Sequence, residues 1–308
     1  MSTTTGTNHQ AANAAPAPRW RISRQELALI AVTIVWGSTF LIVHLAMRHC
    51  GPLFFVGVRF VAAGAMSWLV FGRGLRAPNR RELVAGAAIG LSICLGYGLQ
   101  TLGLKTISSS QSAFITALYV PIVPLLQLAV LRRPVHLMGW VSVVLAFLGL
   151  VLLAGPDAGR LSFSPGEVAT LLGAVAIAAE VILISRFANE VDSRQVTIVQ
   201  LFAAGLFSLA GMPLAGEALP GFSWIWLSAA LGLGAASAVI QLTMNWAQKS
   251  ISPTKATVIY AGEPVWGGVF GRLGGDRLPP LALAGAGLIV AGVVLSEIRP
   301  KRPGAAED

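Results

Sequence analysis

The chain is built from two related halves, and this duplication constrains its fold more than any other feature. Residues 59–64 (RFVAAG) return as residues 200–205 (QLFAAG), and residues 105–108 (KTIS) return as residues 249–252 (KSIS). The offsets are 141 and 144 residues, close to half of the 308-residue chain. A long internal repeat of this kind indicates two copies of one structural unit that bury their apolar faces against each other.

The composition places this repeat in a membrane. Hydrophobic residues make up 55% of the chain and charged residues 11%, and the mean hydropathy is +0.73. Soluble domains carry about 25% charged residues, so the surface of this protein is expected to face lipid. The formal charge of +9 is scattered between apolar stretches and forms no single basic stripe, which argues against a nucleic-acid partner.

Ten apolar stretches are long enough to be read as transmembrane helices. They span residues 25–46, 52–72, 81–102, 109–131, 137–154, 165–187, 195–214, 222–247, 254–271 and 280–297. The connections between them are short and contain Pro, Gly or charged residues, so no segment is long enough to be a further soluble domain. The sequence therefore predicts an all-α polytopic membrane protein, with a disordered cytoplasmic tail at 1–24 and a second cytoplasmic tail at 298–308.

The distribution of basic residues predicts the orientation. With the N-terminus inside, 16 Lys and Arg residues fall in the inner loops and tails and 5 in the outer loops, which places both termini in the cytoplasm. Each half, 25–154 and 165–297, then has five spans. An odd number means that the second half enters from the opposite side, so Lys105 lies outside and its counterpart Lys249 inside. We expect two five-helix units inverted about an axis in the membrane plane, a plan typical of transporters with a substrate site between the halves.

Several motifs resemble the EamA-type members of the drug/metabolite transporter superfamily over residues 25–297. In chain order they are WGSTF at 36–40, Pro52, Arg59, Glu263 with Pro264, GGD at 274–276 and AGAG at 284–287. The resemblance implies ten helices in two EamA repeats and transport of small metabolites, often outward. Within the family the chain is most similar to YddG-type exporters of aromatic and other neutral amino acids, which lie in the bacterial inner (plasma) membrane. It departs from the family pattern at Arg132 and Arg133, where glutamate is common, and at Asp276, which replaces glutamate.

A charge within a membrane span costs about 2.5–3.5 kcal/mol at mid-helix, so three ionisable residues within predicted spans are considered first. Glu263 either lines a polar cavity or is held in a hydrogen bond between helices. Glu180 either binds a substrate ammonium or a proton, or pairs with an arginine such as Arg186. Arg59, whose counterpart is the neutral Gln200, either caps carbonyls, pairs with a carboxylate or binds a substrate carboxylate.

Polar and aromatic residues at mid-span complete the candidate site. Pro264 removes a backbone donor near Tyr260, and Pro121 and Pro124 are expected to bend the fourth span. Ser and Thr in membrane helices are often satisfied by their own backbone, which is the alternative to cavity lining. The predicted substrate-binding residues are Trp36, Ser38, Thr39, Tyr97, Gln100, Ser112, Thr116, Tyr119, Glu180, Gln241, Asn245, Tyr260 and Glu263, with Trp246 as a further aromatic wall.

No phosphate-binding loop, metal-ligand cluster or nucleophile–base pair is visible, so we expect neither an enzyme nor a bound cofactor. Cys50 and Cys94 are interpreted as buried free thiols. Transport is then secondary, as facilitated diffusion or as exchange with protons or a counter-solute. The partners are a small-molecule substrate and membrane lipids, and the oligomeric state is left open. A phosphorylated substrate would need several basic residues at mid-depth, which favours neutral or zwitterionic metabolites such as amino acids. Efflux of cationic drugs and a passive channel are the alternatives.

Overall fold

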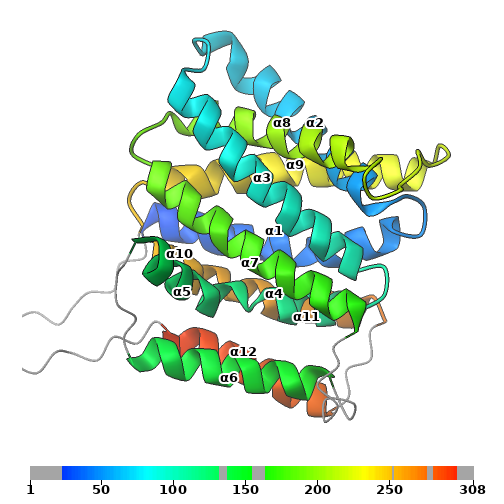
Figure 1. The fold of residues 1–308 in the computed structure, drawn as a ribbon, viewed down its shortest axis with the longest axis vertical. Coiled ribbons are helices and arrows are strands. Elements are labelled where there is room, and N and C mark those ends of the chain that lie inside the picture. The colour runs from blue at the N-terminus through cyan, green and yellow to red at the C-terminus, as the bar shows by residue number, and fades with distance from the viewer. Residues whose placement is uncertain (1–22, 132–136, 155–163, 252, 276–279, 297–308) are drawn as a thin grey trace, which may run out of the picture.

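The protein is described by a computed structural model that covers residues 23–131, 137–154, 164–251, 253–275 and 280–296, and all regular secondary structure in this part of the chain is helical (Figure 1). The terminal tails predicted at 1–24 and 298–308 lie almost wholly outside the described residues, as do Arg132, Arg133 and Asp276. The helices are α1 (Arg24–Ala46), α2 (Pro52–Phe71), the 3₁₀ helix η1 (Gly72–Gly74), α3 (Arg80–Gly103), α4 (Ser109–Thr116), α5 (Tyr119–Leu131), α6 (Leu137–Ala154), α7 (Pro165–Phe187), α8 (Ser193–Gly211), α9 (Trp224–Ala247), α10 (Pro253–Tyr260), α11 (Gly262–Leu273) and α12 (Pro280–Ser296).

Each of the ten apolar stretches coincides with one helix or with two short consecutive helices. Six helical segments are long and apolar enough to cross a membrane: Arg24–Ala46, Pro52–Gly74, Arg80–Gly103, Ser109–Val130, Pro165–Phe187 and Trp224–Ala247. Shorter apolar stretches occur at Trp140–Gly149 in α6 and Leu283–Gly292 in α12. The all-α membrane class is confirmed, while the remaining spans are still predictions.

Capping residues explain where several helices begin. A Ser or Asn precedes the first turn and a Glu or Gln follows three residues later, so that each side chain accepts a hydrogen bond from the backbone N–H of the other. The four pairs are Ser23 with Glu26, Asn79 with Glu82, Ser108 with Gln111, and Ser164 with Glu167. These four pairs are capping boxes, and they satisfy backbone N–H donors at helix ends that hydrocarbon could not satisfy.

Prolines account for two interruptions in the spans. Pro121 has no N–H to donate to the carbonyl of Ala117, and the helix is interrupted at residues 117–118, between α4 and α5. Pro264 likewise leaves the carbonyl of Tyr260 without a helical donor, and α10 ends at that residue. The fourth span is thus interrupted near Pro121, as the expected bend implies, whereas Pro124 lies inside α5 without ending it.

The helices of the two halves interleave. Helix α3 packs against α7 and α8, α2 against α8 and α9, and α1 against α9 and α11. The pair α6 and α12 forms a layer of its own at one edge of the bundle (Figure 1). Gly149 lets these two helices touch, because a Cβ there would lie 2.6 Å from the carbonyl oxygen of Gly285. The most extensive contacts thus join helices from opposite halves, and the centre of the bundle lies between them.

Polar links tie the connections together at each end of the bundle. At one end Arg76 forms a bidentate ion pair with the buried Glu82, which also accepts a hydrogen bond from the backbone of Asp192. At the other end Glu217 accepts hydrogen bonds from the backbone N–H groups of Leu53 at 3.0 Å and Phe54 at 2.8 Å. Glu217 thereby caps α2, whose own N-cap, a glycine, has no side chain to do so.

Close packing near the bundle centre predicts the effect of one substitution. A Cβ on Gly37 would lie 2.6 Å from the Cβ of Trp266 and 2.9 Å from the carbonyl oxygen of Glu263. Gly37→Val should therefore destabilise the fold by about 1–3 kcal/mol through overpacking. Gly232→Ala is the matched control, because a Cβ at Gly232 meets nothing within 4 Å. Thermal unfolding in detergent measures both, and an unchanged melting temperature for Gly37→Val would contradict the packing.

Candidate functional site

Four aromatic residues from four helical segments meet at the centre of the bundle. The ring centroid of Trp36 lies 6.4 Å from that of Tyr97, 6.3 Å from that of Tyr119 and 5.8 Å from that of Tyr260. All four side chains are buried. Trp36 is the common neighbour, so the aromatic cluster is organised around α1.

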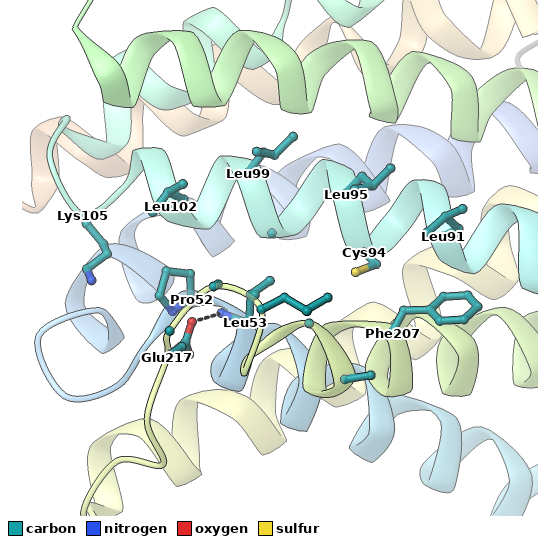
Figure 2. Close-up of a pocket in the computed structure, with 16 residues that line it drawn as sticks. Pro52, Leu53, Leu91, Cys94, Leu95, Leu99, Leu102, Lys105, Phe207 and Glu217 are labelled. Atoms are coloured by element: carbon teal, nitrogen blue, oxygen red, sulfur yellow. Dashed lines mark hydrogen bonds between the residues drawn. The ribbon is translucent and has the colours of Figure 1, made fainter.

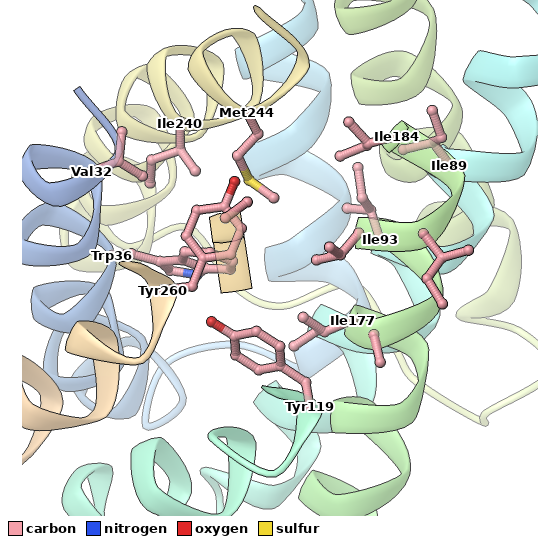
Figure 3. Close-up of a cluster of buried hydrophobic side chains, with 14 of the residues drawn as sticks. Val32, Trp36, Ile89, Ile93, Tyr119, Ile177, Ile184, Ile240, Met244 and Tyr260 are labelled. Atoms are coloured by element: carbon pink, nitrogen blue, oxygen red, sulfur yellow. The ribbon is translucent and has the colours of Figure 1, made fainter. Parts of the chain in front are cut away.

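An apolar wall faces this cluster. Ile93 of α3 and Ile177 of α7 lie across from Trp36, Tyr119 and Tyr260, and Met244 of α9 lies above them (Figure 3). These side chains supply contact surface but no hydrogen bonds. The polar chemistry of the site must therefore come from the groups that border the rings.

Glu263 joins the two interrupted helices. Its Oε2 accepts a hydrogen bond of 3.1 Å from the hydroxyl of Tyr119, the first residue of α5. Its Oε1 is buried and has no partner among the described residues. The hydrogen bond between helices is therefore present at one oxygen of Glu263, while its place in a polar cavity is still a prediction.

Glu180 is the second carboxylate of the site. Its Oε1 accepts a hydrogen bond of 2.7 Å from Gln241, whose own side-chain oxygen accepts one of 2.8 Å from Gln200. Its Oε2 has no partner in the part of the chain that the structure describes. The alternative of a pair with Arg186 is not found among the described ion pairs, because Glu180 faces the bundle interior rather than its surface.

Several buried polar atoms of the bundle interior have no hydrogen-bond partner among the described residues. A buried polar atom without a partner costs about 1–3 kcal/mol, and native proteins contain few of them. Five such atoms, on five helices, are Trp36 Nε1, Arg59 Nη2, Ser112 Oγ, Glu180 Oε2 and Glu263 Oε1. Their presence in one bundle interior indicates a binding site more readily than a packed core.

Several predicted residues serve the structure around the site. Gln100 donates to the hydroxyl of Thr116 at 3.1 Å, and Thr39 donates to the carbonyl of its neighbour Trp36 at 2.7 Å. Asn245 donates to Thr197, to Gln200 and to the carbonyl of Gln241. These side chains are buried but already hydrogen-bonded, so they are better placed to position their neighbours than to bind a substrate directly.

Two predicted residues lie away from the centre. The hydroxyl of Ser38 donates to the carbonyl of Val35 at 2.7 Å, and Ser38 faces a groove between α1 and α9. Trp246 is 42% exposed on the outer side of α9, so it is not part of the aromatic wall. Their helical position alone did not reveal which face of each helix is turned inward.

Three residues of the site were not among the predicted substrate-binding set. Arg59 is buried beside Tyr97, and its Nε donates to the hydroxyl of Ser237 at 2.8 Å. Gln248 donates to the Tyr260 hydroxyl at 3.3 Å and accepts from Ser185 at 2.7 Å. The charge of Arg59 within an apolar span was a visible signal, whereas Ser237 and Gln248 carried none.

A hollow lies at the periphery, between α2, α3 and α8 (Figure 2). It has a volume of about 690 Å³ and is lined mainly by apolar residues, of which six are leucines, with Lys105 and Glu217 at one end. Both Glu217 oxygens accept backbone hydrogen bonds there, so its charge serves the start of α2. Among the described residues no group of three His, Cys, Asp or Glu side chains could hold a metal ion, either here or at the centre.

Comparison with known proteins identifies the class of this bundle. The family model of the EamA-like transporter family matches residues 24–155 and again residues 164–298. The chain therefore belongs to the EamA-like transporter family. It is a membrane transporter built from two copies of the family's domain, and its class of partner is a small-molecule substrate in a lipid environment.

Individual relatives agree with this assignment. The chain is 31% identical over 280 residues to the uncharacterized inner membrane transporter YedA of Escherichia coli K12, covering 87% of this chain and 89% of that protein. It is 27% identical over 275 residues to an uncharacterized transporter of Archaeoglobus fulgidus, covering 89% and 86%. A crystal structure with 21% identity superposes with a TM-score of 0.65 over 90% of this chain and 99% of the other, which supports the fold. Neither relative's name assigns a substrate, so similarity to amino-acid exporters is still a prediction.

The hydrogen bonds of Glu180 allow the site to be tested by stability. Gln241→Leu removes the donor to Glu180 and the acceptor for Gln200, leaving both without that bond. We expect a loss of about 1–3 kcal/mol of unfolding free energy from the unsatisfied groups. Ser38→Ala, which removes a hydroxyl bonded only to its own helix, should leave stability nearly unchanged. Equal melting temperatures for the two variants in detergent would refute the network.

Proposed function

We propose that this protein is a secondary transporter that exports small neutral or zwitterionic metabolites across the bacterial inner membrane, most favourably amino acids including aromatic ones. The observation that carries the proposal is the convergence of unpartnered polar atoms around the rings of Trp36, Tyr97, Tyr119 and Tyr260. Aromatic and aliphatic walls fit the body of such a solute, and a few polar atoms fit its charged groups.

The proposed mechanism is alternating access between two inverted five-helix repeats. One support is the pattern of helix contacts, which occur in reciprocal pairs. If α1, α2 and α3 correspond to α7, α8 and α9, the contact of α3 with α7 matches that of α9 with α1, and that of α3 with α8 matches that of α9 with α2. In the same correspondence α2 contacts its own counterpart α8, and α6 contacts its own counterpart α12. Contacts of this kind are expected across a two-fold axis.

A second support comes from one hydrogen bond. Tyr119 and Glu263 are 144 positions apart, and the offset between the two copies of the repeat in this region is 143 to 144, as Pro121 with Pro264 and Lys105 with Lys249 show. A contact between positions that are equivalent to within one residue lies close to the axis that relates the two halves. The axis would then pass beside the two interrupted helices, where the substrate is expected.

Efflux of cationic metabolites or drugs is a second candidate function. Aromatic faces attract cations, and two buried carboxylates, Glu180 and Glu263, each have an oxygen without a partner. Proton coupling fits the same groups, because a carboxylate in a low-dielectric interior is costly unless a proton or a cation neutralises it.

Counterflow in proteoliposomes tests the proposed function. Uptake of radiolabelled Phe or Thr should saturate and should be accelerated by unlabelled amino acid on the opposite side. A linear flux without this acceleration would indicate a passive channel, and competition by UDP-sugars alone would reverse the substrate assignment. Inhibition only by organic cations would favour the second candidate function.

Glu263→Gln tests the carboxylate. Loss of a charge-assisted hydrogen bond to the substrate or of a proton-binding group should lower transport by about 10- to 100-fold, while the amide can still accept a bond from Tyr119. Glu190→Gln is the control, because Glu190 is 43% exposed and pairs only loosely with Arg81 at 3.9 Å. Equal transport by the two variants would remove Glu263 from the mechanism.

The orientation can be tested by labelling. Leu219 and Arg73 lie in exposed segments at the outer and inner ends of the proposed topology. In a variant with Cys50 and Cys94 replaced by Ala, an impermeant maleimide should label Leu219→Cys in intact spheroplasts and Arg73→Cys only after permeabilisation. Labelling of both from the same side would exclude this topology.

A further inference from the structure

Arg59 is a buried cation whose electrostatic partner is missing. Its side chain is 2% exposed, and its Nε donates to the hydroxyl of Ser237 at 2.8 Å. Its Cζ lies 5.3 Å from the ring centroids of Phe60 and Tyr97. Among the described residues its Nη2 has no hydrogen-bond acceptor, and no carboxylate lies within 4.0 Å of it.

Burial of the Arg59 guanidinium costs free energy unless an anion pairs with it. A guanidinium stays protonated in proteins, and a charge removed from water requires a partner of opposite sign. The two rings recover part of this cost through cation–π attraction, but they accept no hydrogen bond from Nη2. The same chain does pair its charges elsewhere, because the buried Glu82 receives a bidentate arginine. The unpaired state of Arg59 therefore points to an anion that is not part of the protein.

The surroundings of Arg59 limit this anion to a small one. Of the Arg and Lys side chains that the structure describes, Arg59 is the only buried one. One guanidinium edge and the hydroxyl proton of Ser237 match the two oxygens of a single carboxylate. A phosphate ester, with its larger charge, would require more basic groups than this interior provides.

Helix packing explains why Ser237 can take part. The carbonyl oxygen of Arg59 would lie 3.0 Å from a Cβ on Gly234, so the absence of a side chain at Gly234 lets α2 and α9 approach. Ser237 follows three residues later and therefore lies on the same face of α9. The close approach brings its hydroxyl to the guanidinium.

Arg59 also borders the aromatic cluster. Tyr97, on which its guanidinium stacks, lies 6.4 Å from Trp36 and within electrostatic range of both Glu180 and Glu263. A positive group and two negative groups, each with an unpartnered atom, therefore border one set of rings. A ligand that satisfies all of them carries a carboxylate, an ammonium and an apolar body.

We propose that Arg59 and Ser237 bind the carboxylate of the transported solute, so that a carboxylate is required in its substrates. This inference rests on the proposed function and deepens it, because it selects amino acids over organic cations. Arg59 becomes the residue that determines specificity, while the carboxylates of Glu180 and Glu263 are left to meet the ammonium group.

Matched ligands test the proposal with the full-length protein. Phenylalanine, phenethylamine and 3-phenylpropionate share a ring and differ in which charged group they carry. For the wild type, we expect phenylalanine and 3-phenylpropionate to raise the melting temperature in detergent and phenethylamine to act more weakly. In Arg59→Gln the affinity for the two carboxylates should fall about 10- to 100-fold, with that for phenethylamine unchanged. Gln200 occupies the matching position of the second half, so glutamine is compatible with this fold.

Ser237→Ala supplies an independent test in case Arg59→Gln fails to fold. It retains the guanidinium and should weaken binding of both carboxylates several-fold without affecting phenethylamine. Equal losses for all three ligands, or no loss, in the folded variants would overturn the proposal. So would stabilisation by sodium chloride or phosphate alone that disappears in Arg59→Gln, since the anion would then be inorganic. Binding of 3-phenylpropionate without any amino acid would retain Arg59 as the carboxylate site and refute the proposed amino-acid substrate.

Discussion

Hydrocarbon provides no hydrogen bonds, and this constraint explains most of what the protein does with its polar groups. Helices satisfy their own backbone, capping boxes satisfy the first turns, and Glu217 reaches from another connection to satisfy α2. Buried side chains follow the same rule where they hold the fold together, as the bonds among Gln200, Gln241 and Asn245 illustrate. Against this thorough pairing, the unpartnered atoms around Trp36 are exceptions that a ligand can resolve.

The two halves contribute different chemistry to the centre. At an offset of 144 positions Tyr97 corresponds to Gln241, and Glu263 lies within one position of the counterpart of Tyr119. The first half therefore supplies rings where the second supplies carboxyl and amide groups. Arg59, the one buried Arg or Lys side chain among the described residues, belongs to the first half and corresponds to a glutamine. A duplicated fold has in this way acquired a site with two unlike sides, which suits a solute with two unlike charged groups.

The sequence predicts the helices well, because membrane spans are specified by local properties. Apolar length determines where the spans lie, and prolines determine where α4 and α10 end, so both follow from the chain itself. Which side of a helix faces inward depends on its neighbours. Ser38 and Trp36 are two residues apart in α1, yet only Trp36 reaches the centre.

The site required tertiary information for a related reason. Tyr119 and Glu263 are both recognisable as candidates, but the bond between them depends on how the halves dock. For Arg59 the charge was visible, whereas the absence of a carboxylate beside it was not. An unpaired group can be identified only when all of its neighbours are known, and here those neighbours come from α3 and α9 as well as α2.

The position of the Tyr119–Glu263 bond has a consequence for alternating access. If the two halves exchange conformations, each contact between unlike positions is replaced by its reciprocal contact. The bonds from Leu53 and Phe54 to Glu217 are of this kind, so they belong to one state and must break in the other. Contacts between nearly equivalent positions lie beside the axis, where such an exchange moves residues least, and the Tyr119–Glu263 pair is of this kind. In such a mechanism the contacts beside Tyr119 and Glu263 are kept, while the contacts of Glu217 at one end of the bundle are exchanged. The substrate would then keep its central contacts while access changes sides.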